Sequence, residues 1–185
     1  MFNVNEITVE EIKAQIETEI QNLDWKGYKV EIQDDIPFLV QLSVVGKGAN
    51  NPLCKTAAVT NPDLNTTTFY AEVILDQIKH NPLNKIFLKK GIIGWFVRKL
   101  SNAHSIEEAY KQIIHQLVIH ENRHVHQFAW IKEHADIVNV DEVIEAESKS
   151  LYGMGTLEKD AFRYQSKEKN IPFEEVFKKF IHTAA

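Results

Sequence analysis

The longest helical pattern in this 185-residue chain is the feature that most constrains its fold. Ser105-Ile106-Glu107-Glu108 is a capping box, and apolar residues follow it at helical spacing to about His134. The predicted buried stripe comprises Ile106, Ala109, Tyr110, Ile113, Ile114, Leu117, Val118, Glu121, Val125 and Phe128. Glu121 falls on or beside this stripe, where a solvated glutamate is not expected. We therefore predict a helix over residues 105–134 with an inward-facing carboxylate.

Glu121 is the second residue of an H-E-x-x-H motif, which reads His120-Glu121-Asn122-Arg123-His124. Histidines four residues apart lie one above the other on a helix face, so both imidazoles can reach one zinc ion. The glutamate beside the first histidine is positioned to polarise a water molecule bound to that metal. The alternative is a chance motif, because the chain contains eight histidines.

The third zinc ligand is not part of the motif, although catalytic zinc sites use three protein ligands. The metzincin pattern requires glycine at position 127 and histidine at 130, and the chain has Gln127 and Trp130 there. A carboxylate remains, and we favour Glu158 because Ala161 lies on the same helix face and permits close packing. Glu145 is the leading alternative. The other candidates are Asp160, Glu147 and Glu142.

Two segments together resemble a known family. H-E-x-R-H-x-x-Q at residues 120–127, followed by E-K-D-A-F-x-Y at 158–164, looks like the small zincin-like metallopeptidases found in bacteria and their phages. The layout is also similar to gluzincins with an E-x-x-A glutamate helix. The resemblance implies a zinc-dependent peptidase with His120, His124 and Glu158 as ligands and Glu121 as general base. It further implies a zincin-like core, in which a small mixed sheet packs on the histidine helix.

Several polar residues near the motif are candidates for supporting roles. Arg123 is expected to pair with a carboxylate of the glutamate helix, such as Asp160, or to be a solvated charge. Asp160 alternatively orients a ligand histidine. Gln127, one turn beyond His124, is either a hydrogen-bond partner near the site or a surface residue. The candidate donors to an oxyanion are Tyr152, Tyr164, Arg123 and His182.

The rest of the pattern predicts a single α+β domain over residues 1–185, with strands mainly between 28 and 75. We expect a helix capped by Thr8, strands at 28–32, 38–45 and 66–75, a loop at 46–65 with a short strand at 56–60, a helix capped by Asp141, a glutamate helix at 156–169 and a last helix near Phe173. The strand at 66–75 is a candidate sheet edge for an extended peptide. The basic apolar stretch 85–100 is interpreted as a connector or short helix, and the alternative is a segment that rests on a membrane surface.

Composition narrows the function classes. A net charge of −5 predicts no nucleic-acid partner, and the one cysteine, Cys54, excludes an internal disulfide. The sequence has no signal peptide or membrane span, so we expect a cytoplasmic protein that acts on a peptide or protein substrate. Two alternatives stay open. One is a non-catalytic zincin-fold binding or structural protein, and the other is a zinc amidohydrolase that acts on a non-peptide amide.

Overall fold

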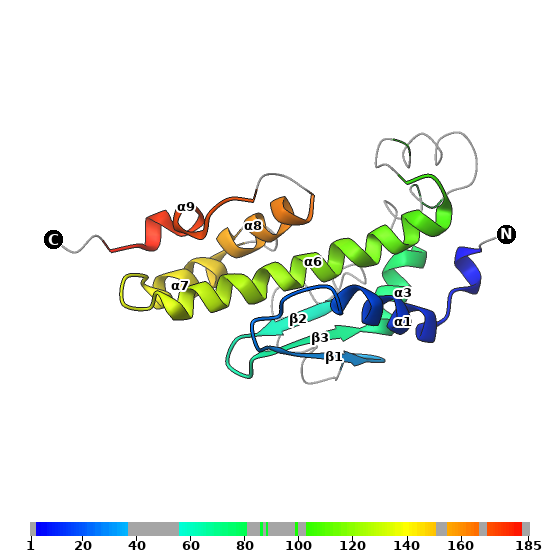
Figure 1. The fold of residues 1–185 in the computed structure, drawn as a ribbon, viewed down its shortest axis with the longest axis horizontal. Coiled ribbons are helices and arrows are strands. Elements are labelled where there is room, and N and C mark those ends of the chain that lie inside the picture. Colours follow the sequence, from blue (N-terminus) through cyan, green and yellow to red (C-terminus); the bar gives the residue numbers. More distant parts are fainter. Residues whose placement is uncertain are drawn as a thin grey trace. The chain divides into compact units, whose positions relative to one another are not determined.

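A computed structural model describes residues 3–36, 56–80, 86, 88, 99, 103–150, 155–166 and 170–182. These residues form a small three-stranded mixed sheet and a larger set of helices (Figure 1), which confirms the α+β class. The elements are η1 (Val4–Glu6), α1 (Val9–Ile20), β1 (Lys29–Gln33), β2 (Ala58–Asn61), β3 (Thr66–Tyr70), α3 (Ala71–His80), α6 (Ile106–Glu133), α7 (Val140–Lys149), α8 (Thr156–Gln165), α9 (Phe173–Val176) and η3 (Lys178–Phe180). The zincin-like core stays a prediction.

The chain divides into two compact units. The first is drawn from Met1–Leu23, Val30–Val59 and Thr67–Val118, and the second from Asp24–Lys29, Thr60–Thr66 and Ile119–Ala185. Both the sheet and α6 contribute residues to each unit. The long helix agrees with the predicted range of 105–134. The expectation of a single domain over residues 1–185 stays a prediction.

The first unit contains α1, which begins as the sequence predicts. The Thr8 hydroxyl accepts a hydrogen bond from the Glu11 backbone N–H at 3.2 Å, and the Glu11 carboxylate accepts one from the Thr8 N–H at 2.8 Å. This reciprocal bonding satisfies two amides at the helix start. Ile12 and Ile16 are fully buried, and α1 packs against α3.

The sheet has the order β1-β3-β2. β1 runs parallel to β3, with Lys29 N–H donating to Asn65 O at 2.9 Å, and β2 runs antiparallel to β3 (Figure 1). The prediction that residues 66–75 form one edge strand is wrong in two respects. β3 ends at Tyr70 and is the central strand of this sheet.

Helix α3 begins at Ala71, directly after β3, because the apolar residues of this segment follow a helical period. Ala71, Ile74 and Ile78 are buried at spacings of three and four residues. Glu72 in the first turn and Lys79 in the last suit the helix dipole. The β-branched residues of this segment favoured a strand in the sequence, but the positions of its charged residues fit a helix.

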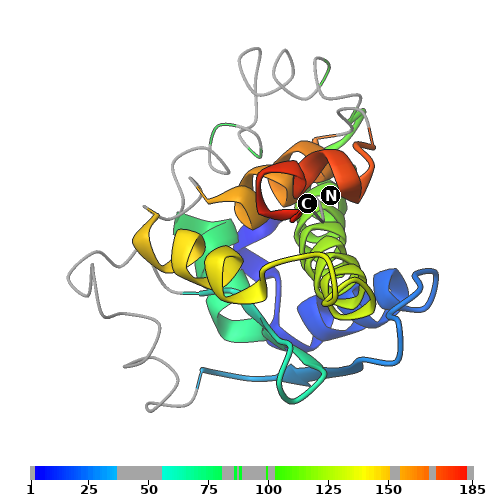
Figure 2. The ribbon, with the colours of Figure 1, turned by 90° about the vertical axis from the view of Figure 1, so that its left-hand side faces the viewer.

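The second unit packs the C-terminal part of α6 with α7, α8 and α9 (Figure 2). Its apolar core comprises Trp130, Ile131, Val138, Val143, Leu157, Phe177 and Phe180. Trp130 stacks on Phe177, with ring centroids 5.3 Å apart and planes inclined by 12°. A single antiparallel bridge between Val138 and Ile181 ties the chain end to the segment that follows α6.

Three helix boundaries in this unit differ from the prediction. α7 is capped by Asn139, whose side chain accepts from Glu142 N–H at 3.2 Å, and not by Asp141. α8 is helical to Gln165, and the expected extension over 167–169 lies outside the described residues. The last helix ends earlier than its apolar face from Phe173 to Phe180 indicates, since α9 ends at Val176 and the 3-10 helix η3 follows.

Three predicted segments lie partly or wholly beyond the described residues. These are the strand at 38–45, the loop at 46–65, which is described from residue 56 onward, and the basic apolar stretch 85–100, of which residues 86, 88 and 99 are described. Among the helices that the structure describes, none has the length and apolar character needed to cross a bilayer.

Candidate metal centre

The two motif histidines lie in a stretch of α6 that is buried on every side. All residues from His120 to Val125 are buried, although a surface helix normally buries one stripe. His120 is 6% exposed and His124 is 7% exposed. The Asn122 side chain, on another face of the helix, donates to the backbone O of Asp24 at 2.8 Å. Polar side chains enclosed in this way need partners.

The imidazole nitrogens converge on Glu158 of α8. His120 Nε2 and His124 Nε2 are 3.1 Å apart. His120 Nε2 lies 3.3 Å from Glu158 Oε2, and His124 Nε2 lies 3.4 Å from Glu158 Oε1. These three residues form the one group in the described chain whose histidine, cysteine, aspartate or glutamate atoms are arranged to hold a metal ion.

The chemistry of this group fits a metal ion. The Nδ1 atom of His124 faces the Gln127 amide oxygen at 2.8 Å, so this ring donates from Nδ1 and, when neutral, presents a lone pair at Nε2. The Nδ1 atom of His120 lies 3.0 Å from Gln165 Oε1. Glu158 Oε2 is buried and has no hydrogen-bond partner among the described residues. When the rings are neutral, His124 Nε2 and the Glu158 carboxylate oxygens face one another as acceptors, so a cation or a proton is needed among them. Ligand atoms on a tetrahedral zinc ion stand about 3.3 Å apart, close to these separations.

The local field favours a cation at the same place. Burial lowers the pKa of His124, but the Glu158 carboxylate, the Glu121 carboxylate and the Gln127 amide oxygen outweigh it and raise that pKa to about 9. Burial raises the pKa of Glu158, and the two imidazoles outweigh it, so this pKa lies well below its usual range. Without a metal, a proton thus sits where the cation would bind.

Glu121 faces inward, as the sequence predicts, and is held by the sheet. It is buried, and its Oε2 accepts a hydrogen bond from the Thr60 hydroxyl on β2 at 2.9 Å. Its charge also acts on His124. The carboxylate is therefore fixed beside the histidine pair.

The turn before α8 positions Glu158. Glu147 of α7 accepts a hydrogen bond from Leu157 N–H at 2.9 Å, and this carboxylate caps the start of α8. Gly155 is the N-cap residue, and a Cβ there would overlap the Glu147 carboxylate. Glu158 lies in the first turn of α8, one residue after Leu157, which is buried in the apolar core. The core and the cap together fix where Glu158 meets the histidines.

The structure brings most of the predicted site residues together. Arg123 forms the expected ion pair with Asp160, from Nε to Oδ2 at 2.7 Å. Gln127 is fully buried beside His124, so the surface interpretation of this residue is wrong. Tyr164 lies beneath the Arg123 guanidinium, 4.8 Å from its carbon to the ring centroid.

Other candidates lie elsewhere. Glu145 is exposed and pairs with Lys149, and Glu142 is also exposed. Glu147 caps α8, and His182 is exposed. Tyr152 lies outside the described residues. Arg123 is committed to Asp160, Asn170 and Ile171, so it is poorly placed to serve as an oxyanion donor.

Three site residues were not predicted from the sequence. Thr60 lies far from the motif, and a threonine on a strand carries no distinctive signal. Gln165 Oε1 lies 3.0 Å from His120 Nδ1, and its position about two helical turns after Glu158 on the same face of α8 was the available hint. Phe162 packs against His120 with ring centroids 4.7 Å apart and is 41% exposed.

No family model, curated protein or solved structure matches this chain.

Proposed function

We propose that this protein is a zinc-dependent peptidase of the zincin type, with His120, His124 and Glu158 as zinc ligands. The observation that carries the proposal is the convergence of two imidazole nitrogens and a carboxylate at 3.1–3.4 Å, with a buried glutamate beside them. A purely structural zinc site is closed by a fourth protein ligand. In the described residues the group has three members, and a base adjoins it.

Glu121 is the proposed general base. Thr60 donates to its Oε2, and Oε1 accepts no hydrogen bond in the part of the chain that the structure describes. Oε1 is thus suited to accept a proton from an attacking water molecule and return it to the leaving amine. A bound zinc ion would supply Lewis acidity, making water acidic near pH 7 and polarising a carbonyl.

The sheet offers a way to bind an extended peptide. β2 is an outer strand of the described sheet, and its Thr60 touches Glu121. A peptide that added to an outer strand by main-chain hydrogen bonds would need no particular side-chain sequence. The outer strand that contacts Glu121 is β2, so β2 takes the place of residues 66–75 as the candidate edge for binding an extended peptide.

The test combines metal analysis with cleavage of a quenched-fluorescent peptide library. We expect about one zinc per chain, cleavage that stops on chelation, and recovery when zinc is restored. Glu121→Gln should keep zinc and lose at least about 100-fold in rate, the lower range for loss of general base catalysis. Thr18→Ala, on an exposed surface of α1, is the matched control and should cleave normally.

Three outcomes would decide against the proposal. Failure of the wild type to bind zinc would remove the site, and unchanged cleavage by Glu121→Gln would remove the mechanism. Zinc binding without cleavage of any peptide would favour the non-catalytic alternative, or an amidohydrolase if small amides were hydrolysed instead.

A further inference from the structure

Gln127 is fully buried and contacts three different residues. Its Oε1 lies 2.8 Å from His124 Nδ1. Its Nε2 lies 2.7 Å from Asp160 Oδ2 and 3.0 Å from the backbone O of Leu157. One side-chain amide therefore joins a histidine of the metal group to the beginning of α8.

These contacts allow one orientation of the amide. Asp160 and the Leu157 carbonyl offer only acceptors, so the NH2 group of Gln127 must face them and its oxygen must face His124. An oxygen cannot donate, so His124 Nδ1 must carry a proton. A neutral His124 ring then has its lone pair on Nε2, the atom that faces His120 and Glu158.

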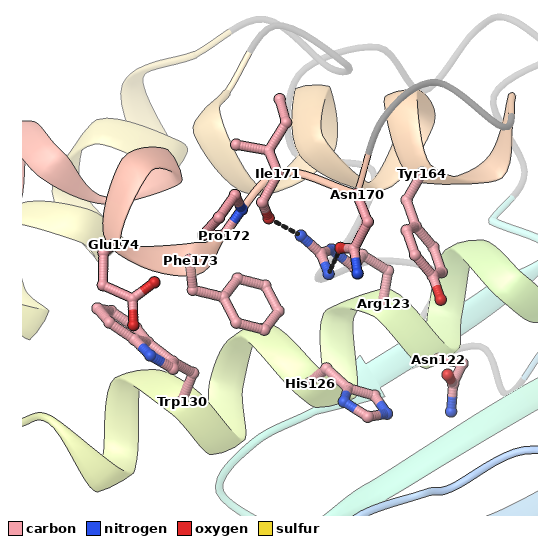
Figure 3. A pocket seen from close by; sticks show the side chains of 10 residues that line it. All are labelled: Asn122, Arg123, His126, Trp130, Tyr164, Asn170, Ile171, Pro172, Phe173 and Glu174. Carbon is pink, nitrogen blue, oxygen red and sulfur yellow. Dashed lines mark hydrogen bonds between the residues drawn. The ribbon is translucent and has the colours of Figure 1, made fainter.

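Arg123 holds Asp160 in turn. Its guanidinium donates from Nε to Asp160 Oδ2 at 2.7 Å and from Nη2 to Oδ1 at 3.1 Å, and both side chains are buried. It also donates to Asn170 Oδ1 and Ile171 O (Figure 3). Its carbon lies 4.0 Å from the ring centroid of Phe173. Asp160 therefore has little freedom to move away from Gln127.

His120 has a looser partner. Its Nδ1 lies 3.0 Å from Gln165 Oε1, but Gln165 is only partly buried and lies in the last turn of α8. No second contact of the Gln165 side chain is found among the described residues, so nothing there dictates which way its amide faces. The two histidines have the same kind of partner, and only one of those partners is fixed.

We propose that Gln127, Asp160 and Arg123 form a positioning relay that fixes the His124 ring with its proton on Nδ1 and Nε2 directed at the metal group. The inference rests on the metal site of the proposed function. It assigns no reacting role to the three residues. His124 is then the preset ligand, and His120 is the ligand that adapts.

The first test measures zinc affinity by competition with a chromophoric chelator. Gln127→Met keeps the size of the side chain and removes the acceptor, and we expect zinc affinity to fall by about 10–100-fold. Gln127→Glu keeps an acceptor for His124 but loses the donors to Asp160 and the Leu157 carbonyl, so zinc affinity should recover only part of that loss. Gln165→Met is the matched control and should lose less than Gln127→Met.

A role in packing alone predicts the reverse order. A fully buried site tolerates methionine better than glutamate. A folded Gln127→Met protein that binds zinc like the wild type, or a Gln127→Glu protein that binds more weakly than Gln127→Met, would overturn the proposal.

The second test reads the His124 ring directly and needs neither activity nor a variant that folds. In wild-type protein labelled with ¹⁵N-histidine, we expect a slowly exchanging Nδ1–H on His124 with or without zinc. ¹¹³Cd in the site should couple to His124 Nε2. Rapid exchange of that proton, or coupling to Nδ1, would overturn the proposal. A wild type that binds no metal but keeps the protected Nδ1–H would remove the peptidase function and leave the relay standing.

Discussion

His124 and His120 occupy the same face of one helix, yet the chain holds them in different ways. His124 is held by a buried amide whose orientation is dictated by an ion pair. His120 is held by a partly buried amide at a helix end and by Phe162, a phenylalanine that is 41% exposed. Because burial removes competing water, the same hydrogen bond restricts His124 more than it restricts His120.

This difference shows that one histidine of a small site can be held rigidly while the contacts of the other remain partly exposed. The His124 side adjoins the apolar core around Trp130 and Leu157, so it has enough packing to hold a charged network in place. Besides Glu158, the α8 residues that contact His120 are Phe162, which is 41% exposed, and the partly buried Gln165. In the proposed peptidase, a substrate would more readily reach the metal group from the His120 side than from the His124 side.

The largest expected effect comes from the group that both histidines share. Glu158→Ala removes the carboxylate from His120 and His124 together, so zinc affinity should fall by more than the about 10–100-fold typical of losing an outer partner. Equilibrium dialysis followed by metal analysis measures the zinc affinity of the variant and of the wild type. Glu145→Ala, an exposed residue paired with Lys149, should bind zinc normally. If Glu145→Ala lost zinc and Glu158→Ala did not, the third ligand would be Glu145 and not Glu158.

The next largest effect is on the unfolding free energy, and it tests how firmly the residues around His124 are held. Arg123→Met leaves the buried Asp160 carboxylate without its cationic partner, which should cost about 3–5 kcal/mol of unfolding free energy. Chemical denaturation of the zinc-free protein measures this cost. Lys149→Met breaks an exposed pair in the same unit and should have no measurable effect. Equal midpoints for the two variants would contradict a tightly held His124 side.

Protonation of His124 gives a pH-dependent effect. The pKa of His124 in the folded, zinc-free protein is raised from 6.5 to about 9. Its contribution to stability is therefore complete below pH 6.5 and is lost as the pH rises through 9. Zinc must displace this proton, so zinc affinity should rise by about tenfold per pH unit between these values. Titrations at fixed ionic strength measure the slope, and a flat profile would contradict the assignment.

The smallest effect concerns the start of α8. Gly155→Ala should displace the Glu147 carboxylate from Leu157 N–H and cost about 1 kcal/mol, the usual value of a helix cap. Glu147→Ala removes the same cap. Thermal denaturation of both variants and of the double variant should therefore give a combined loss well below the sum. Full additivity would show that Gly155 and Glu147 act separately.

Local patterns made much of the site predictable. The spacing of the apolar residues indicated α6 and the inward direction of Glu121, and the motif placed His120 and His124 on one face. The partnership of Arg123 with Asp160 was also expected, because opposite charges on facing helices tend to pair. These features depend on helix geometry, which the sequence specifies within a few residues.

Features that depend on tertiary contacts were not predicted. The contact of Thr60 with Glu121 depends on which strand lies outermost in the sheet, and local sequence patterns do not predict the order of strands. The change from β3 to α3 at Tyr70 was missed because valine and isoleucine favour strands until packing against α1 decides otherwise. The orientation of the Gln127 amide needed the positions of both its acceptors.

X-ray absorption at the zinc edge of the loaded protein tests the central claim most directly. The account predicts one zinc per chain, surrounded by nitrogen and oxygen at about 2.0–2.1 Å with the scattering pattern of two imidazole rings. Glu158→Ala should alter this spectrum, and Glu145→Ala should not. Absence of bound zinc, a spectrum without imidazole scattering, or sulfur from Cys54 at about 2.3 Å would contradict the account.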